Sequence, residues 1–213
     1  MRFVTDSEFI PPPQIPFPAG TSPFRQKGTG YLGDLEYFAA KVPGGPGAVL
    51  RGVVDEGTRA FLSQRFSAAE WYDAFPNVYL QLVAARLCGL SLEEHRRRVG
   101  AFHANALGGM YRALLRVVSN ENVAIWGPRA MALYWDFGKT ETRVTGLKEV
   151  VAIRHGTPKA LLQWTAWAAA GFADATLRLA GATDATTTLG EVEAEGEQAG
   201  QELFSFKMRM MWK

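Results

Sequence analysis

Cysteine is almost absent from this chain of 213 residues, in which Cys88 is the only one. A single cysteine excludes a disulfide scaffold within the chain, and it also excludes a four-thiolate zinc site and an iron–sulfur cluster. Cys88 stands at the end of an expected helix, so we interpret it as a packing residue rather than a nucleophile.

Long apolar runs are scarce as well. The most apolar segment, 160–173, has about 14 residues, which is too few to cross a bilayer. Near the N-terminus Asp6 and Glu8 interrupt the apolar core that a secretory signal needs. These features predict a cytoplasmic protein without a transmembrane segment.

A large excess of one charge sign is also lacking, because the chain has 23 basic and 21 acidic residues and a net charge of +2. So small an excess does not indicate nucleic-acid binding. The stretch 184–202 contains no lysine or arginine and would repel a polyanion. We therefore expect no nucleic-acid partner, and we expect the acidic stretch between Glu191 and Glu202 to form a solvated loop between the last two strands.

Catalytic and metal-binding motifs are missing. The serine-nucleophile patterns G-x-S-x-G and S-x-x-K do not occur. His95 and His103 stand eight residues apart, not the four that direct two imidazoles at one metal. His95 precedes the arginine run 96–98, so we expect both to be exposed and solvated. The sequence predicts no catalytic residue, no metal and no cofactor, and it favours a protein that is not an enzyme.

Three glycines near the start of the first expected helix resemble a nucleotide-binding motif. Gly28-Thr-Gly30-Tyr-Leu-Gly33 matches the dinucleotide fingerprint, but no buried strand precedes it. We interpret it as a flexible entry into the first helix.

Proline is concentrated at the N-terminus, where residues 1–26 hold six of the eleven prolines. Such a segment cannot form a helix or a central strand. It is either loose or laid across the body. We therefore divide the chain into a proline-rich tail, 1–26, and a single α+β domain resembling ligand-binding domains, 27–213.

The periodicity of apolar residues predicts a helical half followed by a sheet. Helices are expected at 31–42, 49–66, 76–89, 92–107, 111–118 and 158–179. Ser91 and Glu94 form a capping box at the start of the fourth. Strands are expected at 140–145, 147–153, 186–188 and 203–213. The predicted fold class is α+β, with an N-terminal helical half packed on a four-stranded antiparallel sheet in the order β-β-α-β-β.

Aromatic residues are the most prominent feature of the sequence. They are consistent with an ordinary core or with an apolar pocket between helices and sheet. For such a pocket we predict seven lining residues: Phe102, His103, Trp126, Tyr134, Trp135, Trp164 and Trp167.

Several short motifs resemble a large paralogous family of unknown function in myxobacteria. They are Lys27-Gly-x-Gly-Tyr31, Leu35-Glu-Tyr-Phe38, Trp71-Tyr-Asp-Ala-Phe-Pro76, Ser91-Leu-Glu-Glu94 with Val99-Gly100, and the closing strand Phe204-x-Phe-x-Met-x-Met-x-Trp212. The resemblance covers residues 25–213.

That family resembles the superfamily of haem-NO-binding domains, four-vinyl-reductase-like domains and TRAPP subunits. The resemblance implies an apolar cavity for haem, a small hydrophobic molecule or an acyl chain, and often a dimer. The haem branch carries an axial histidine on the helix before the sheet, whereas 120–138 contains none. The Tyr-x-Ser-x-Arg clamp of that branch and the cysteine clusters of other relatives are missing too.

Two functions remain open at this point. The first is a non-enzymatic module that binds or senses a small apolar or amphipathic ligand. The second is a ligand-free adaptor, as a homodimer or with another protein partner. Its interface would be an apolar sheet edge or the small residues Ala168, Gly171 and Ala175 on the 158–179 helix.

Overall fold

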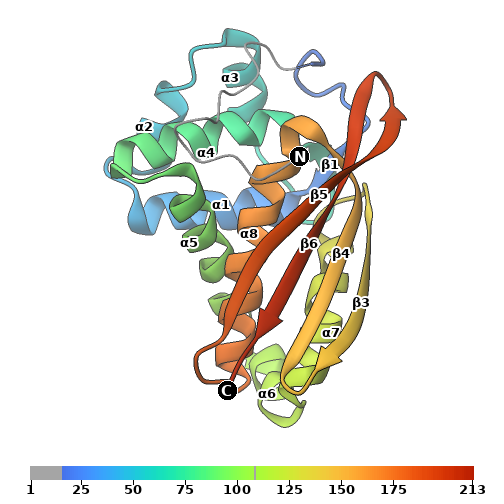
Figure 1. Ribbon diagram of the computed structural model, residues 1–213. Helices are drawn as coiled ribbons and strands as arrows, with labels where there is room; N and C mark the ends of the chain where they lie inside the picture. The colour runs from blue at the N-terminus through green and yellow to red at the C-terminus, as the bar shows by residue number, and fades with distance from the viewer. Residues whose placement is uncertain (1–15, 108) are drawn as a thin grey trace. The chain divides into compact units, whose positions relative to one another are not determined.

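The computed structural model describes residues 16–107 and 109–213 (Figure 1). These residues form two compact units. The helical unit comprises 16–95 and 133–137, and the sheet unit comprises 96–107, 109–132 and 138–213. Helix α5 (Leu92–Asn105) runs from the first unit into the second.

The helical unit contains four helices and a short two-stranded sheet among its described residues. The elements are β1 (Arg25–Lys27), α1 (Gly28–Lys41), α2 (Gly45–Arg51), α3 (Glu56–Leu62), β2 (Trp71–Asp73) and α4 (Phe75–Cys88). β1 and β2 are antiparallel, and the segment 133–137 joins them through a bridge between Gln26 and Trp135. The expected helix 49–66 is wrong in its extent, because residues 52–55 break it between α2 and α3.

The glycine pattern lies inside α1, which starts at Gly28. A Cβ on Gly28 would lie 1.9 Å from the carbonyl oxygen of Ser67, and one on Gly30 would lie 2.2 Å from Nε2 of Gln26. These glycines permit close packing of the backbone against its neighbours. The expected flexible entry is therefore an ordered first turn of helix.

A chain of buried polar side chains crosses the helical unit. Asn77 donates to Asp34 at 2.6 Å and to Gln26 at 2.7 Å, and Gln81 donates to Asn77 at 3.0 Å. Nε2 of His95 lies 2.9 Å from Oε1 of Gln81. All five side chains are buried. The expected exposure of His95 is wrong, because the ring is buried and its Nε2 lies against Gln81 on α4 inside the core.

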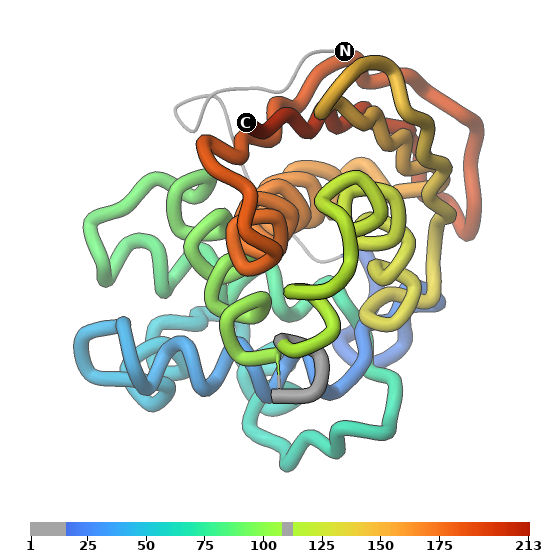
Figure 2. Tube along the Cα trace, turned by 90° about the horizontal axis from the view of Figure 1, so that it is seen from below, coloured from blue at the N-terminus to red at the C-terminus, as the bar shows by residue number. Residues whose placement is uncertain are grey.

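The sheet unit consists of a four-stranded antiparallel sheet and the helices that cover it. The strands lie in the order β3-β4-β6-β5. Their bounds are β3 (Lys139–Gly146), β4 (Glu149–Pro158), β5 (Thr186–Gln198) and β6 (Gln201–Met211), and the other elements are α6 (Gly109–Val117), α7 (Asn120–Arg129), a short 3-10 helix (Ala130–Leu133) and α8 (Lys159–Leu179). The strands arch over α7 and α8 (Figure 2).

The period of two in the last strand is confirmed. Phe204, Phe206, Met208 and Met210 are buried and belong to the core of the sheet unit. The predicted fold class is also confirmed: the chain is a mixed α+β protein with an antiparallel four-stranded sheet, and α8 connects its two hairpins. No helix among the described residues is long and apolar enough to span a membrane.

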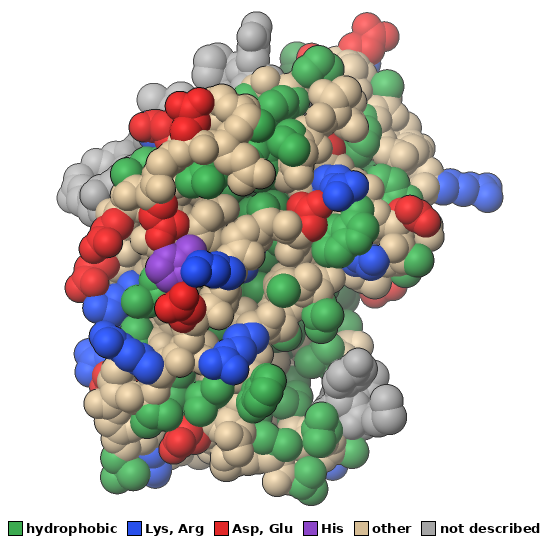
Figure 3. Space-filling model, turned by 90° about the vertical axis from the view of Figure 1, so that its right-hand side faces the viewer, with side chains coloured by type: hydrophobic (Ala, Val, Ile, Leu, Met, Phe, Trp, Pro, Cys, Tyr) green, Lys and Arg blue, Asp and Glu red, His purple; other side chains and the backbone are tan. Residues whose placement is uncertain are grey.

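The acidic stretch is a strand rather than the expected loop, since β5 extends to Gln198. Two of its glutamates pair with basic groups on other strands of the sheet: Glu191 with Lys207 of β6 at 2.8 Å, and Glu195 with His155 of β4. Acidic and basic side chains are intermingled over the side formed by β3 and β4 (Figure 3). The backbone ladder with β6 holds this charged strand, and opposite charges across the sheet add small favourable contacts.

Helices α5 and α8 cross at two glycines in the sheet unit. A Cβ on Gly100 would lie 2.0 Å from the carbonyl oxygen of Ala168, and a Cβ on Gly171 would lie 2.0 Å from that of Arg97. The small-residue face of α8 is therefore covered by α5 of the same chain. The expectation that this face forms a subunit interface is wrong, because its close contact is already made.

Candidate functional site

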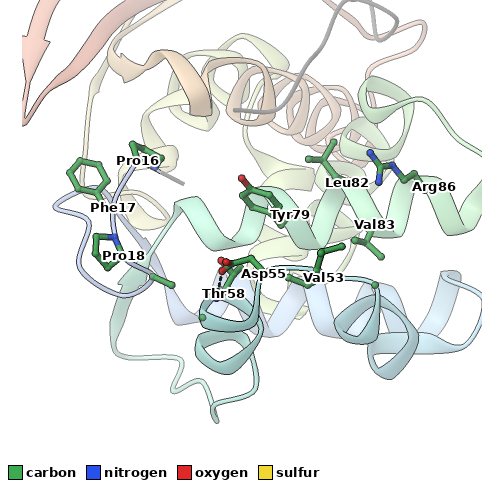
Figure 4. A pocket seen from close by; sticks show the side chains of 14 residues that line it. Pro16, Phe17, Pro18, Val53, Asp55, Thr58, Tyr79, Leu82, Val83 and Arg86 are labelled. Carbon is green, nitrogen blue, oxygen red and sulfur yellow. Dashed lines mark hydrogen bonds between the residues drawn. The ribbon is translucent and has the colours of Figure 1, made fainter. Parts of the chain in front are cut away.

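A cleft of about 830 Å³ opens on the surface of the helical unit (Figure 4). Three segments that are distant in the sequence line it: residues 16–19, residues between 52 and 58, and the face of α4 between 79 and 86. All of them belong to the helical unit, so this unit holds the whole lining.

Helix α4 contributes one face to the cleft. Tyr79, Leu82, Val83 and Arg86 follow the helical spacing i, i+3, i+4 and i+7, which places them on one side. The first three are half-buried and Arg86 is exposed. The helix forms here because a proline occupies its first turn and Gly89 ends it in the left-handed conformation at φ +64°.

The loop between α2 and α3 approaches α4 closely. A Cβ on Gly52 would lie 2.4 Å from Cγ1 of Val83, so glycine permits this approach. Val53 is buried and anchors the loop. Asp55 caps α3, because its Oδ1 accepts a hydrogen bond of 2.6 Å from the backbone of Thr58. Hydrogen bonds from Thr58 hold the pKa of Asp55 below its ordinary value of 3.8, so the carboxylate is ionised at neutral pH.

The N-terminal segment forms the third wall. The ring centre of Phe17 lies 5.5 Å from that of Phe75 and 6.3 Å from that of Phe24. Just beyond it, the carboxylate of Asp73 accepts a hydrogen bond of 3.0 Å from the backbone N–H of Gly20. These contacts fix the segment on the helical unit, so the cleft has a preformed wall.

The polar groups of the cleft differ along its length. Burial and the nearby charge of Asp55 raise the pKa of Tyr79, which therefore keeps its proton at neutral pH. Figure 4 shows the guanidinium of Arg86 beside Leu82, at the end away from Phe17. The cleft thus combines apolar walls with a carboxylate, a hydroxyl and a cation.

The seven side chains predicted for an aromatic pocket fall in both units. The sheet unit holds Phe102 and His103 on α5, Trp126 on α7, and Trp164 and Trp167 on α8. The helical unit holds Tyr134 and Trp135. That all seven line one pocket stays a prediction.

Two of the predicted tryptophans belong to the core of the sheet unit. Trp164 and Trp167 are 0% and 1% exposed. The guanidinium of Arg96 lies 4.9 Å from the ring centre of Trp164, and its Nε donates to the Trp164 carbonyl at 3.2 Å. The expected exposure of the arginine run is therefore wrong for Arg96. Trp126 is 63% exposed instead, with the guanidinium of Arg129 5.4 Å from its ring centre.

Sequence reasoning missed the polar groups of the cleft: Asp55, Tyr79 and Arg86. Two local signals were available, namely an aspartate three residues before a threonine at a helix start and the spacing from Tyr79 to Arg86 on α4. The convergence of the three segments was not available, because it depends on tertiary packing.

The histidines offer no metal centre. Within 16–107 and 109–213, no group of three or more His, Cys, Asp or Glu side chains could hold a metal ion. His95 lies against Gln81 in the buried polar chain, and His155 pairs with Glu195.

Of three comparisons with known proteins, only the one with solved structures finds a likeness. No family model and no curated protein sequence matches the chain. Among solved structures, an oxygen-binding H-NOX domain related to soluble guanylate cyclases is 13% identical with a TM-score of 0.60, over 88% of this chain and 95% of the other. A mutant H-NOX domain of T. tengcongensis is 12% identical with a TM-score of 0.58, over 88% and 97%.

A third neighbour is the Cs H-NOX domain carrying 4-cyano-L-phenylalanine, which is 12% identical with a TM-score of 0.62 over 88% and 96%. The chain therefore has an H-NOX-like fold. At these identities the likeness concerns the fold alone.

A further H-NOX neighbour is described in terms of haem distortion. The segment expected to supply an axial ligand does not fit haem in this chain. An axial histidine needs a ring nitrogen that faces the iron. The stretch from α7 to residue 138, where the haem branch is expected to carry its axial histidine, contains no histidine, and Nε2 of His95 lies against Gln81 inside the polar chain. We therefore assign no role to haem in this chain.

Proposed function

We propose that this protein is a non-enzymatic module that binds a small amphipathic molecule in the cleft of the helical unit. The observation that carries the proposal is the cleft itself. Its volume of about 830 Å³ lies within the roughly 300–1,000 Å³ that is usual for ligand pockets. Its lining is mainly apolar, with a few polar groups that can orient a ligand.

The likeness of the fold supports this proposal. One structural neighbour is described as an oxygen-binding domain, so a protein of similar fold binds a small molecule. The present chain would use a different place and different residues for a different ligand.

The chemistry of the cleft favours binding over catalysis. A nucleophile needs a base within hydrogen-bond reach. Asp55 is engaged as the cap of α3, and the described lining contains no histidine, lysine or cysteine. The groups present can hold a ligand, and no proton-transfer pair is assembled among them.

Four further expectations from the sequence stay proposals, in addition to ligand binding in the cleft. They are a second apolar site at the seven predicted aromatic-pocket residues, membership of the myxobacterial paralogous family, a homodimer and a cytoplasmic location. The adaptor function receives no support from α8, whose small-residue face is covered by α5.

Filling the cleft tests the proposal. We expect Leu82→Trp to weaken binding of the neutral fluorophore N-phenyl-1-naphthylamine about tenfold, because the indole would occupy the space of the ligand. Fluorescence titration measures the affinity. Leu87→Trp is the matched control, since Leu87 lies on the same helix outside the cleft and is 40% exposed. Equal affinity of both variants and the parent protein would overturn the proposal.

A further inference from the structure

The polarity of the cleft changes from one end to the other. At one end the ring of Phe17 and two flanking prolines form an apolar wall. Asp55 and Tyr79 lie in the middle, and Arg86 lies at the other end (Figure 4). A ligand bound here meets apolar carbon, then a carboxylate, then a cation.

The cation is available to a ligand. Arg86 is exposed, and no described carboxylate forms an ion pair with it. One turn before it on the same helix face stand Leu82 and Val83. An arginine beside apolar side chains suits an anionic group joined to an apolar body, because the guanidinium pairs with the anion while the body stays dry.

The carboxylate of Asp55, in the middle of the cleft, determines which way round a ligand binds. Asp55 is ionised at neutral pH, so it repels an anionic group placed beside it. It accepts hydrogen bonds and therefore favours a donor on the ligand at this point. A wholly apolar ligand would cover both Asp55 and Tyr79 without replacing their contacts with water.

We propose that the cleft selects an amphipathic organic anion with an apolar body. Its carboxylate or sulfonate pairs with Arg86, and a hydrogen-bond donor on its body faces Asp55. This inference rests on the proposed function, because it names the ligand class of the same cleft.

Two probes with one carbon framework test the inference. 5-Anilinonaphthalene-1-sulfonate carries an anion and an N–H donor on opposite sides of the naphthalene, and N-phenyl-1-naphthylamine lacks only the sulfonate. We expect Arg86→Gln to weaken binding of the sulfonate about tenfold and to change the affinity for the neutral probe less than about twofold. Arg86→Lys should restore most of the loss.

Arg65→Gln is the matched control, because Arg65 is an exposed arginine of the same unit outside the cleft. Thermal unfolding of each variant checks that the fold is retained. If Leu82→Trp weakens both probes but Arg86→Gln leaves the sulfonate affinity unchanged, the ligand class is wrong and the proposed function stands. If Leu82→Trp weakens neither probe, the cleft is not a binding site and both proposals fail.

Discussion

Buried polar residues determine the interior of the helical unit. Gln26, Asp34, Asn77, Gln81 and His95 are all at most 3% exposed, and hydrogen bonds join them into one chain. Removing one partner from such a network leaves the next group desolvated without compensation, which costs about 1–3 kcal/mol. These residues therefore specify how the first helices fit together as well as stabilising them.

Asp73 is a residue whose ionisation opposes folding. Its carboxylate accepts backbone hydrogen bonds from Gly20, Ser22 and Phe75, yet burial raises its pKa above the ordinary 3.8. A raised pKa in the folded state means that the contribution of this group to stability is complete below pH 3.8. That contribution is lost as the pH rises through the folded-state pKa.

We predict the consequence for Asp73→Asn, which does not titrate. The free energy of unfolding of the parent protein minus that of the variant should fall as the pH rises from about 4 to 7. Urea unfolding at several pH values measures this difference. A difference that grows with pH would show that the backbone hydrogen bonds outweigh the cost of burial.

The start of helix α5 is determined by residues that are neighbours in the sequence. Ser91 and Glu94 were expected to form a capping box, and the Ser91 hydroxyl does accept a hydrogen bond of 3.0 Å from the backbone of Glu94. We predict that Ser91→Ala lowers the free energy of unfolding by about 1 kcal/mol, as loss of an N-cap usually does. Urea unfolding checks the value.

Ser67→Ala serves as the control for the cap, because Ser67 is exposed and precedes no helix. If Ser91→Ala loses no more stability than Ser67→Ala, the cap does not contribute specifically to α5.

Local patterns explain which elements could be predicted. The alternation from Phe204 to Trp212 and the proline in the first turn of α4 are properties of neighbouring residues, so the sequence alone indicates a strand and a helix. The acidic strand β5 was missed because its pairing with β6 is a tertiary contact that its own composition does not indicate. The burial of His95 was missed for the same reason, since Gln81 lies on another helix.

The candidate site was less accessible to sequence reasoning than the fold. Aromatic residues attracted the prediction, yet Trp164 and Trp167 are fully buried in the core of the sheet unit. The cleft instead arises where the three segments that carry Phe17, Asp55 and Arg86 converge. Half-buried residues that converge only through tertiary packing leave no periodic signal in the chain.

The division into two units makes a prediction for the whole molecule. Gly171→Ala places a Cβ against the Arg97 carbonyl, which should destabilise the α5–α8 crossing by about 3 kcal/mol. We expect faster amide hydrogen exchange in α8 and β6 and unchanged exchange in α1 and α4, because each unit has its own core. Mass spectrometry of peptides measures both. Gly127→Ala is the control, since its Cβ meets open space and alanine favours the helix. Equal acceleration in α1 and α4 would show that the molecule opens as one cooperative unit.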